Sequence, residues 1–176
     1  KRQLLEYTDG FNSVLLKALN GQLESQGAPQ NSPLVKNAAD AIGRCYDKNG
    51  MEFSGDYQFI SIHGCDNVVI RDAKVGFLDI KSSIVSIENS HIRGDAIGMK
   101  TYRSRVTATA LTVKASVAVE ATQSRLDLAG VDMIAENEAL MSKGEAKIVF
   151  SVSRIKSKQH DKFYHGIYRV HRDNPL

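Results

Sequence analysis

Tryptophan is absent from this 176-residue chain, proline occurs three times, and aromatic residues make up only 7% of the sequence. Small and β-branched residues fill the middle of the chain instead, a composition that suits thin, regular strands more than a thick core. No run of apolar residues approaches the ~18 that a membrane-spanning helix needs, and no secretory signal peptide is visible. Because the chain starts at Lys1 without Met and moves at once into a helical pattern, we expect an upstream segment that could carry a signal or an anchor.

Sequence motifs for common enzyme chemistry are also missing. The chain has no Gly-rich phosphate loop, no nucleophile elbow and no cysteine pair at zinc-binding spacing. His160, His165 and His171 fall close together, but their spacings of five and six fit neither a helix face nor a zinc site. In an extended strand, His165 and His171 would lie roughly 20 Å apart. We therefore predict no metal site and no cofactor.

The positive charge is concentrated at the C-terminal end. The formal net charge is +3, and residues 145–176 hold seven basic and three acidic side chains, whereas residues 51–144 hold ten basic and twelve acidic ones. A centre that is near neutral argues against a long face that tracks a phosphate backbone. Nucleic acid is therefore a disfavoured partner.

Residues 1–50 are predicted to form a helical N-terminal cap. Apolar residues recur at spacings of mostly three and four over residues 3–24, which indicates one amphipathic helix. Ser32 and Pro33 are a good start for a second helix, because Ser accepts from the first amides and Pro fits the first helical position. The second helix would end in residues 47–50. Its apolar face would consist of Leu34, Ala38, Ala41, Ile42 and Cys45.

A repeat with a period near 20 residues follows. Five ten-residue segments begin at positions 66, 83, 104, 124 and 146, and all carry apolar residues at their third, fifth and tenth positions. A fixed period of this length with short alternating strands is typical of a solenoid. The apolar residues are Val68, Val85, Val106, Leu126 and Ile148 at the third position, Ile70, Ile87, Ala108, Leu128 and Phe150 at the fifth, and Val75, Ile92, Val113, Met133 and Ile155 at the tenth. A second strand follows each of the first four segments, with the apolar pairs Leu78/Ile80, Ile97/Met99, Val117/Val119 and Ala139/Met141.

This repeat resembles the right-handed parallel β-helix superfamily, which includes pectate lyases and related polysaccharide enzymes. The resemblance covers about 100 of the 176 residues and rests on the repeat pattern alone. It implies an all-β solenoid over residues 51–156, a short right-handed parallel β-helix of about five coils. The helical cap would cover one end, and a C-terminal basic strand and tail, residues 157–176, would cover the other.

Two cysteines, Cys45 and Cys65, fall at the end of the second predicted helix and at the first turn of the solenoid. If the helix caps the first coil, a disulfide between them would tie cap to coil and contribute roughly 3 kcal/mol to stability. The alternative is two small buried thiols. A disulfide would indicate an oxidising compartment such as the periplasm.

Basic residues alternate with aromatic ones in the C-terminal strand. Such a strand can bind single-stranded nucleic acid through charge and stacking, or lie on an anionic membrane surface. The alternative is an edge strand whose charges prevent aggregation. The candidate anion-binding residues are Lys156, Lys158, Lys162, Arg169 and Arg172.

The carboxylates do not form a convincing catalytic set. Lyases of the β-helix superfamily use aspartates on neighbouring coils, but the acidic residues here do not recur at equivalent repeat positions, so the resemblance stops at the fold. Glycoside hydrolysis needs two carboxylates facing one cleft, and the predicted turns are too short to wall one. The acidic candidates considered are Asp79, Glu120 and Asp127, and a loop cluster of Asp132, Glu136 and Glu138.

The sequence thus favours a non-catalytic structural or protein-interaction module, as the extracytoplasmic, periplasmic domain of a membrane-anchored bacterial protein. A cytoplasmic location is the alternative. The expected partner is another protein or a second copy of the chain, and a membrane would be reached only through the upstream segment. Two alternative functions stay open: a carbohydrate-binding or polysaccharide-active protein, by fold analogy, and a polyanion binder that uses the C-terminal basic strand.

Overall fold

The computed structural model describes residues 42–170 and residue 176, and shows an all-β parallel solenoid of about six turns. The chain divides into two compact units, residues 1–40 and 41–176, and the described residues belong to the second. The predicted solenoid is therefore confirmed. The part of the predicted helical cap in residues 1–41 lies outside the described residues.

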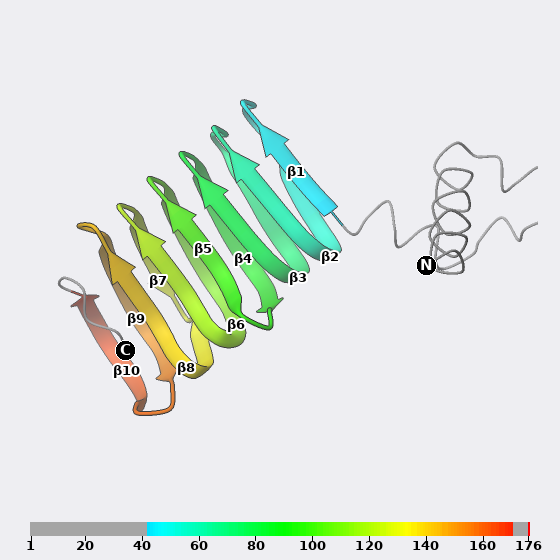
Figure 1. Cartoon of the computed structure of the whole chain (residues 1–176). Helices are drawn as coiled ribbons and strands as arrows, with labels where there is room; N and C mark the ends of the chain where they lie inside the picture. The colour runs from blue at the N-terminus through cyan, green and yellow to red at the C-terminus, as the bar shows by residue number, and fades with distance from the viewer. Residues whose placement is uncertain (1–41, 171–175) are drawn as a thin grey trace, which may run out of the picture. The chain divides into compact units, whose positions relative to one another are not determined.

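Ten strands form one sheet that winds through the coils, and successive coils lie side by side in chain order (Figure 1). All strand pairs are parallel except the last, β9 with β10. Strands β5 and β8 lie off the main path, β5 between β3 and β6 and β8 between β6 and β9. The strands are β1 (Ile42–Tyr46), β2 (Glu52–His63), β3 (Val68–Lys81), β4 (Ile84–Arg93), β5 (Ile97–Tyr102), β6 (Arg105–Thr122), β7 (Arg125–Ala129), β8 (Asp132–Lys143), β9 (Lys147–Lys156) and β10 (Asp161–Val170).

The sequence repeat is reproduced by the strand register. Val68 pairs with Val85, which pairs with Val106, and the third-position column continues in the same way to the last coil. The fifth- and tenth-position columns stack in register too. All fifteen side chains are buried, with at most 3% of their surface exposed. Stacking of equivalent apolar residues from coil to coil therefore builds the core.

Most of the described coils turn two of their corners at single residues in the left-handed conformation. In the interior coils their φ angles lie between 43° and 64°. A left-handed residue reverses the side-chain direction without adding a loop, which explains why the turns are so short. The first corner comprises Asp47, Gly64, Ser82, Arg103, Gln123 and the consecutive pair Gly144 and Glu145, and the second comprises Asp72, Asn89, Ala110, Gly130 and Val152.

A column of buried serines lines the first corner on its inner side. The backbone amide of Ser83 donates to Oγ of Ser104 at 3.2 Å, and the amide of Ser104 donates to Oγ of Ser124 at 3.2 Å. Each hydroxyl in turn donates to the carbonyl two residues earlier in its own coil, as Ser104 does to Tyr102 at 2.8 Å. The serines thus satisfy amides that the corner would otherwise leave buried and unpaired.

One prediction at the N-terminal end is wrong. Residues Ile42–Tyr46, assigned from the sequence to the second helix, form strand β1 and pair in parallel with β2. Gly43 and Cys45 point into the core, and a Cβ at Gly43 would lie 2.9 Å from the ring of Phe53. Ile42, counted among the apolar face of the helix, is 46% exposed. The solenoid therefore already includes Ile42–Tyr46 and does not begin after Gly50.

The predicted last strand is confirmed as β10, which runs antiparallel to β9. Tyr164 packs edge-on against Phe150, with ring centroids 4.8 Å apart, and Tyr168 stacks on the same ring at 5.8 Å. Leu176 pairs through its backbone with Leu140 of β8. Together these contacts cover the open core of the last coil.

Candidate functional site

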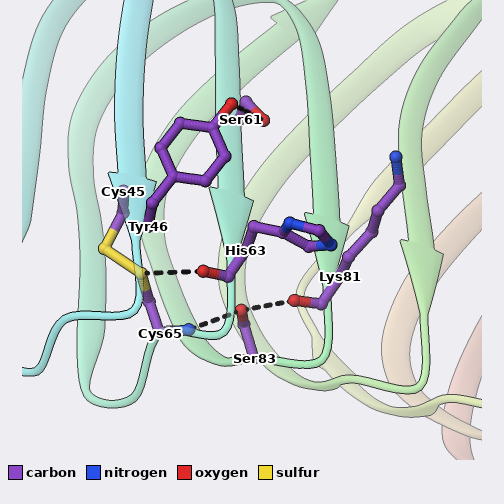
Figure 2. Close-up of a disulfide and its surroundings, with 7 residues drawn as sticks. All are labelled: Cys45, Tyr46, Ser61, His63, Cys65, Lys81 and Ser83. Atoms are coloured by element: carbon purple, nitrogen blue, oxygen red, sulfur yellow. Dashed lines mark hydrogen bonds between the residues drawn. A yellow bond between two sulfur atoms is a disulfide. The ribbon is translucent and has the colours of Figure 1, made fainter.

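The two cysteines are joined in the structure by a disulfide bridge (Figure 2). Cys45 is the second-last residue of β1, Cys65 lies two residues after the end of β2, and their Cα atoms are 6.4 Å apart. Cys65 occupies the inward column that Ser83 continues on the next coil, and its amide donates to Oγ of Ser83 at 2.9 Å. Its sulfur lies 3.4 Å from the carbonyl oxygen of His63, a contact without a hydrogen because the sulfur is bonded to Cys45. The bridge therefore ties the first coil to the second.

The described members of the predicted C-terminal anion site are not gathered on one face. Lys156 and Arg154 both reach Asp161, at 3.7 and 3.1 Å, so their charge is partly neutralised. Lys162 lies opposite the buried Ile155 and sits 5.0 Å above the ring of Tyr164, over the end of the core. The other members are scattered or undescribed: Arg169 pairs with Val149, Lys158 lies between β9 and β10, and Arg172 lies outside the described residues.

The structure instead brings three cations together on β6, β7 and β9. Arg105 pairs in register with Arg125, and Arg125 pairs with Lys147. All three side chains are exposed. Residues opposite each other on adjacent strands point to the same face, about 4.8 Å apart. We call this column of Arg105, Arg125 and Lys147 the basic ladder.

Several other charged residues of the solenoid are paired with opposite charges, although Arg93 of β4 stands opposite Lys114 of β6 as a second pair of like charges. Arg71 on β3 donates to Glu88 of the next coil at 2.9 Å, a bond that raises the pKa of the guanidinium. Glu120 lies within 3.6 Å of Lys100 and 3.3 Å of Lys143, on the coils either side. Within the described residues, no carboxylate lies in ion-pair distance of the basic ladder. The ladder is therefore an uncompensated row of like charges.

An open groove of about 530 Å³ runs along the basic ladder at the first corner. Arg103 adds a fourth cation to its lining, and Glu145 is its one carboxylate. The Nε of Arg103 donates to Oε1 of Gln123 at 3.0 Å, which leaves the amide nitrogen of Gln123 as a further donor. The groove therefore offers cations and neutral donors to an anion.

The backbone behind the groove is held rigidly. The amide of Arg105 donates to the carbonyl of Ser83 at 2.9 Å, and the amide of Arg125 donates to the carbonyl of Ser104 at 2.8 Å. The buried serine column lies directly before these two arginines in the chain. Fixed backbone positions hold the ladder at a constant spacing, which lowers the ordering cost of binding a ligand.

The carboxylates considered for catalysis are spread over three sides of the coil. Asp79 and Glu120 stand in one column with Lys100 between them, and Asp127 lies on β7 beside Thr107. Asp132 pairs with Arg154, and Glu136 is exposed on β8 together with the half-buried Glu138. Oδ2 of Asp79 contacts Lys81 at 2.9 Å, and its buried Oδ1 has no hydrogen-bond partner among the described residues.

The three histidines that fall close together in the sequence, from which no metal site was predicted, also have separate surroundings. Nε2 of His160 lies 2.9 Å from the hydroxyl of Tyr164, and the ring of His165 lies against Phe163. His171 is outside the described residues. Across the part of the chain that the structure describes, no three His, Cys, Asp or Glu side chains are grouped to hold a metal ion.

Comparison with known proteins gives no match, so a function for this chain has to be inferred from its own structure. The chain matches no protein-family model, no curated protein and no solved structure. Among the described residues, no helix has the length and hydropathy needed to cross a membrane.

The basic ladder is the feature that the sequence interpretation missed. Its signal was present in the repeat alignment, where the second position of the last three segments reads Arg105, Arg125 and Lys147. The near-neutral charge of the whole central region concealed it, because acidic residues on other faces balance the sum.

Proposed function

We propose that the solenoid is a non-catalytic binding module that holds an anionic partner along the basic ladder. The single observation that carries this proposal is the register of Arg105, Arg125 and Lys147. Like charges directly opposite each other on a sheet are destabilising. An anionic partner would remove that repulsion, so binding and relief of electrostatic strain act together.

The form of the coils supports binding over catalysis. Because single left-handed residues turn the corners, the described coils carry no long loops that could enclose a substrate. The groove along the ladder is open to solvent along its length. An open row of cations suits an extended partner, whereas catalysis on a small molecule favours an enclosed site.

We further propose an extracytoplasmic location, on the face of a bacterial membrane that the protein reaches through an anchor. The disulfide between Cys45 and Cys65 supports this proposal. Disulfides persist in oxidising compartments and are rare in the cytosol. The proposal predicts that both cysteines are oxidised in protein isolated from cells under thiol-trapping conditions, and trapped free thiols would contradict it.

Binding of anionic polymers as a function of salt concentration tests the proposed function. The full chain is titrated with polyphosphate, polygalacturonate, polyglutamate and an oligothymidylate. We expect at least one polymer to bind at low salt, and Arg125→Glu to weaken it by about tenfold or more and to flatten the salt dependence by about one ion per molecule. Arg44→Glu makes the same charge change on exposed β1, away from the ladder, and is the matched control.

Two outcomes would overturn this function. One is that no polymer binds the wild-type chain even at low salt. The other is that Arg44→Glu weakens binding as much as Arg125→Glu, because net charge rather than the ladder would then explain the interaction.

A further inference from the structure

From the geometry of the basic ladder we infer that its ligand is a condensed phosphate chain of three or more units. This inference rests on the proposed function and names the ligand class of the same site. Three cations in register create two positions for an anion, one between Arg105 and Arg125 and one between Arg125 and Lys147. The two positions are one coil apart, about 4.8 Å.

The number of acceptor oxygens favours phosphate over carboxylate. A carboxylate has two oxygens, and the fork of one guanidinium uses both. A terminal phosphoryl group of a condensed phosphate has three non-bridging oxygens and up to two negative charges, so it can accept from two neighbouring cations at once. Because Arg125 has a like-charged neighbour on each side, an anion that bridges adjacent coils compensates more charge than one bound to a single side chain.

The spacing favours a condensed chain over single phosphates. Phosphorus atoms that share one bridging oxygen lie closer together than two neighbouring coils do. Alternate phosphates of a condensed chain are therefore the pair that matches the two positions, and the phosphate between them would face Arg125. Triphosphate is the shortest chain that spans the ladder on this geometry.

The rest of the face disfavours nucleic acid. Binding of single strands depends on aromatic side chains on which bases stack. Around the ladder, the outward positions of the described coils hold Thr107, Asp127 and Val149 in one column and Thr109, Ala129 and Ser151 in the next. None of these is aromatic, and the exposed carboxylate of Asp127 would repel a chain that crossed the strands. The ligand must therefore be narrow and run along the corner.

The groove also contains one group that opposes an anion. Glu145 stands at the corner just before Lys147 in the chain and lines the same groove. Gln123, the equivalent corner residue on the previous coil, is neutral and has a free amide donor. Replacing Glu145 by Gln therefore removes this negative charge and extends by one coil the part of the groove that favours an anion.

Calorimetric titration of the full chain with inorganic monophosphate, diphosphate and triphosphate at low salt tests the inference. We expect triphosphate to bind about tenfold more tightly than diphosphate, and monophosphate to bind more weakly still. Arg125→Lys keeps the charge but removes the guanidinium fork, so we expect about a tenfold loss for triphosphate. Glu145→Gln should tighten triphosphate severalfold, and Arg44→Glu should change its affinity little.

The possible outcomes distinguish a failure of the phosphate inference from a failure of the proposed function. If triphosphate does not bind, but polygalacturonate or polyglutamate binds in a manner that depends on Arg125, the ladder binds carboxylates and only the phosphate inference fails. If an oligothymidylate binds about tenfold more tightly than triphosphate at equal phosphate concentration, the condensed-chain inference also fails. Equal affinities for the three phosphates would refute the two-position geometry. If none of the anions binds, the inference and the proposed function fail together.

Discussion

Arg105 of β6 and Arg125 of β7 lie directly opposite each other on adjacent parallel strands, with both guanidinium groups exposed on the same face. At the strand spacing of about 4.8 Å, two unit charges repel by roughly 0.9 kcal/mol in water, and side-chain ends that diverge repel less. Lys147 repeats the same relationship with Arg125 on the next coil. Arg125 therefore has a like-charged neighbour on each side, and its replacement is the most informative change in the molecule.

We predict that Arg125→Glu stabilises the free protein. The substitution converts two repulsive cross-strand pairs into two attractive ones, and we expect the free energy of unfolding to rise by about 1 kcal/mol at low salt. Urea unfolding measures the change. The gain should shrink at high ionic strength because exposed charges are screened, and Arg44→Glu should give no comparable gain. A loss of stability at low salt would show that the ladder is already compensated.

The buried serine column predicts a cost for removing a single hydroxyl. Ser104→Ala deletes the acceptor of the Ser83 amide and leaves that buried donor unsatisfied, so we expect a loss of about 1–3 kcal/mol. Ser86→Ala, on the half-buried outward face of β4, is the matched control and should cost little. Denaturant unfolding compares the two variants. Equal effects would mean that the column is not a structural requirement of the corner.

The core columns could be predicted from sequence because every coil repeats the same chemistry at the same position. Val68, Val85 and Val106 are apolar in each coil, so their alignment reproduces the register of the sheet. The columns on the third side of the coil were harder to predict from the sequence. There Ile80 stacks on Thr101 and then on Ala121, so the column loses its hydrophobic signal although all three residues are buried.

The first strand and the basic ladder escaped prediction for different physical reasons. The inward positions of β1 are a glycine and a cysteine, Gly43 and Cys45, which carry little hydrophobic pattern, while the apolar Ile42 faces outward. The spacing of apolar residues up to Cys45 therefore fitted a helix as well as a strand. The ladder lies at exposed positions. The apolar pattern of the sequence predicts which residues are buried, but not which exposed charges lie next to each other. Only the register of Arg105 with Arg125 reveals its electrostatics.

Val152 is a β-branched residue in the left-handed conformation, with a φ of 47°, and its side chain is 55% exposed. The equivalent corner of the previous coil is Gly130, with a φ of 61°. For most L-residues this conformation costs roughly 1–2 kcal/mol of stability, whereas Asn adopts it more readily. We predict that Val152→Asn stabilises the protein by about 1 kcal/mol in thermal or urea unfolding. Gly130→Val is the reciprocal variant and should destabilise the protein. If neither substitution changes the stability, Val152 is not strained.

The disulfide predicts a local effect of reduction. Cys45 and Cys65 are separated by 20 residues, and closing a loop of this size contributes about 3 kcal/mol. Thiol titration of the unreduced protein should find no free thiol, and reduction should lower stability by about that amount. The double variant Cys45→Ala with Cys65→Ser, whose serine continues the column of Ser83, should match the reduced protein. Two free thiols before reduction would refute the bridge.

The packing of β10 over the end of the core, here called the C-terminal cap, should become less stable at alkaline pH because of Tyr164. Burial raises the pKa of this tyrosine, and the nearby Tyr168 adds a smaller rise. The native state then keeps its proton to higher pH than the unfolded chain, whose tyrosines titrate near 10. The contribution to stability is therefore complete below about pH 10 and is lost as the pH rises through the raised native value.

Tyr164→Phe separates this titration from packing. The phenylalanine keeps the edge-on contact with Phe150 but loses the hydroxyl that lies 2.9 Å from His160. We expect the variant to be somewhat less stable at neutral pH and to lose less stability than the wild type between about pH 10 and 12. Urea unfolding across this range measures both, and Tyr46→Phe, at an exposed position on β1, controls for the loss of one tyrosine. If the variant and the wild type lose stability in parallel, Tyr164 is not the group that links the cap to pH.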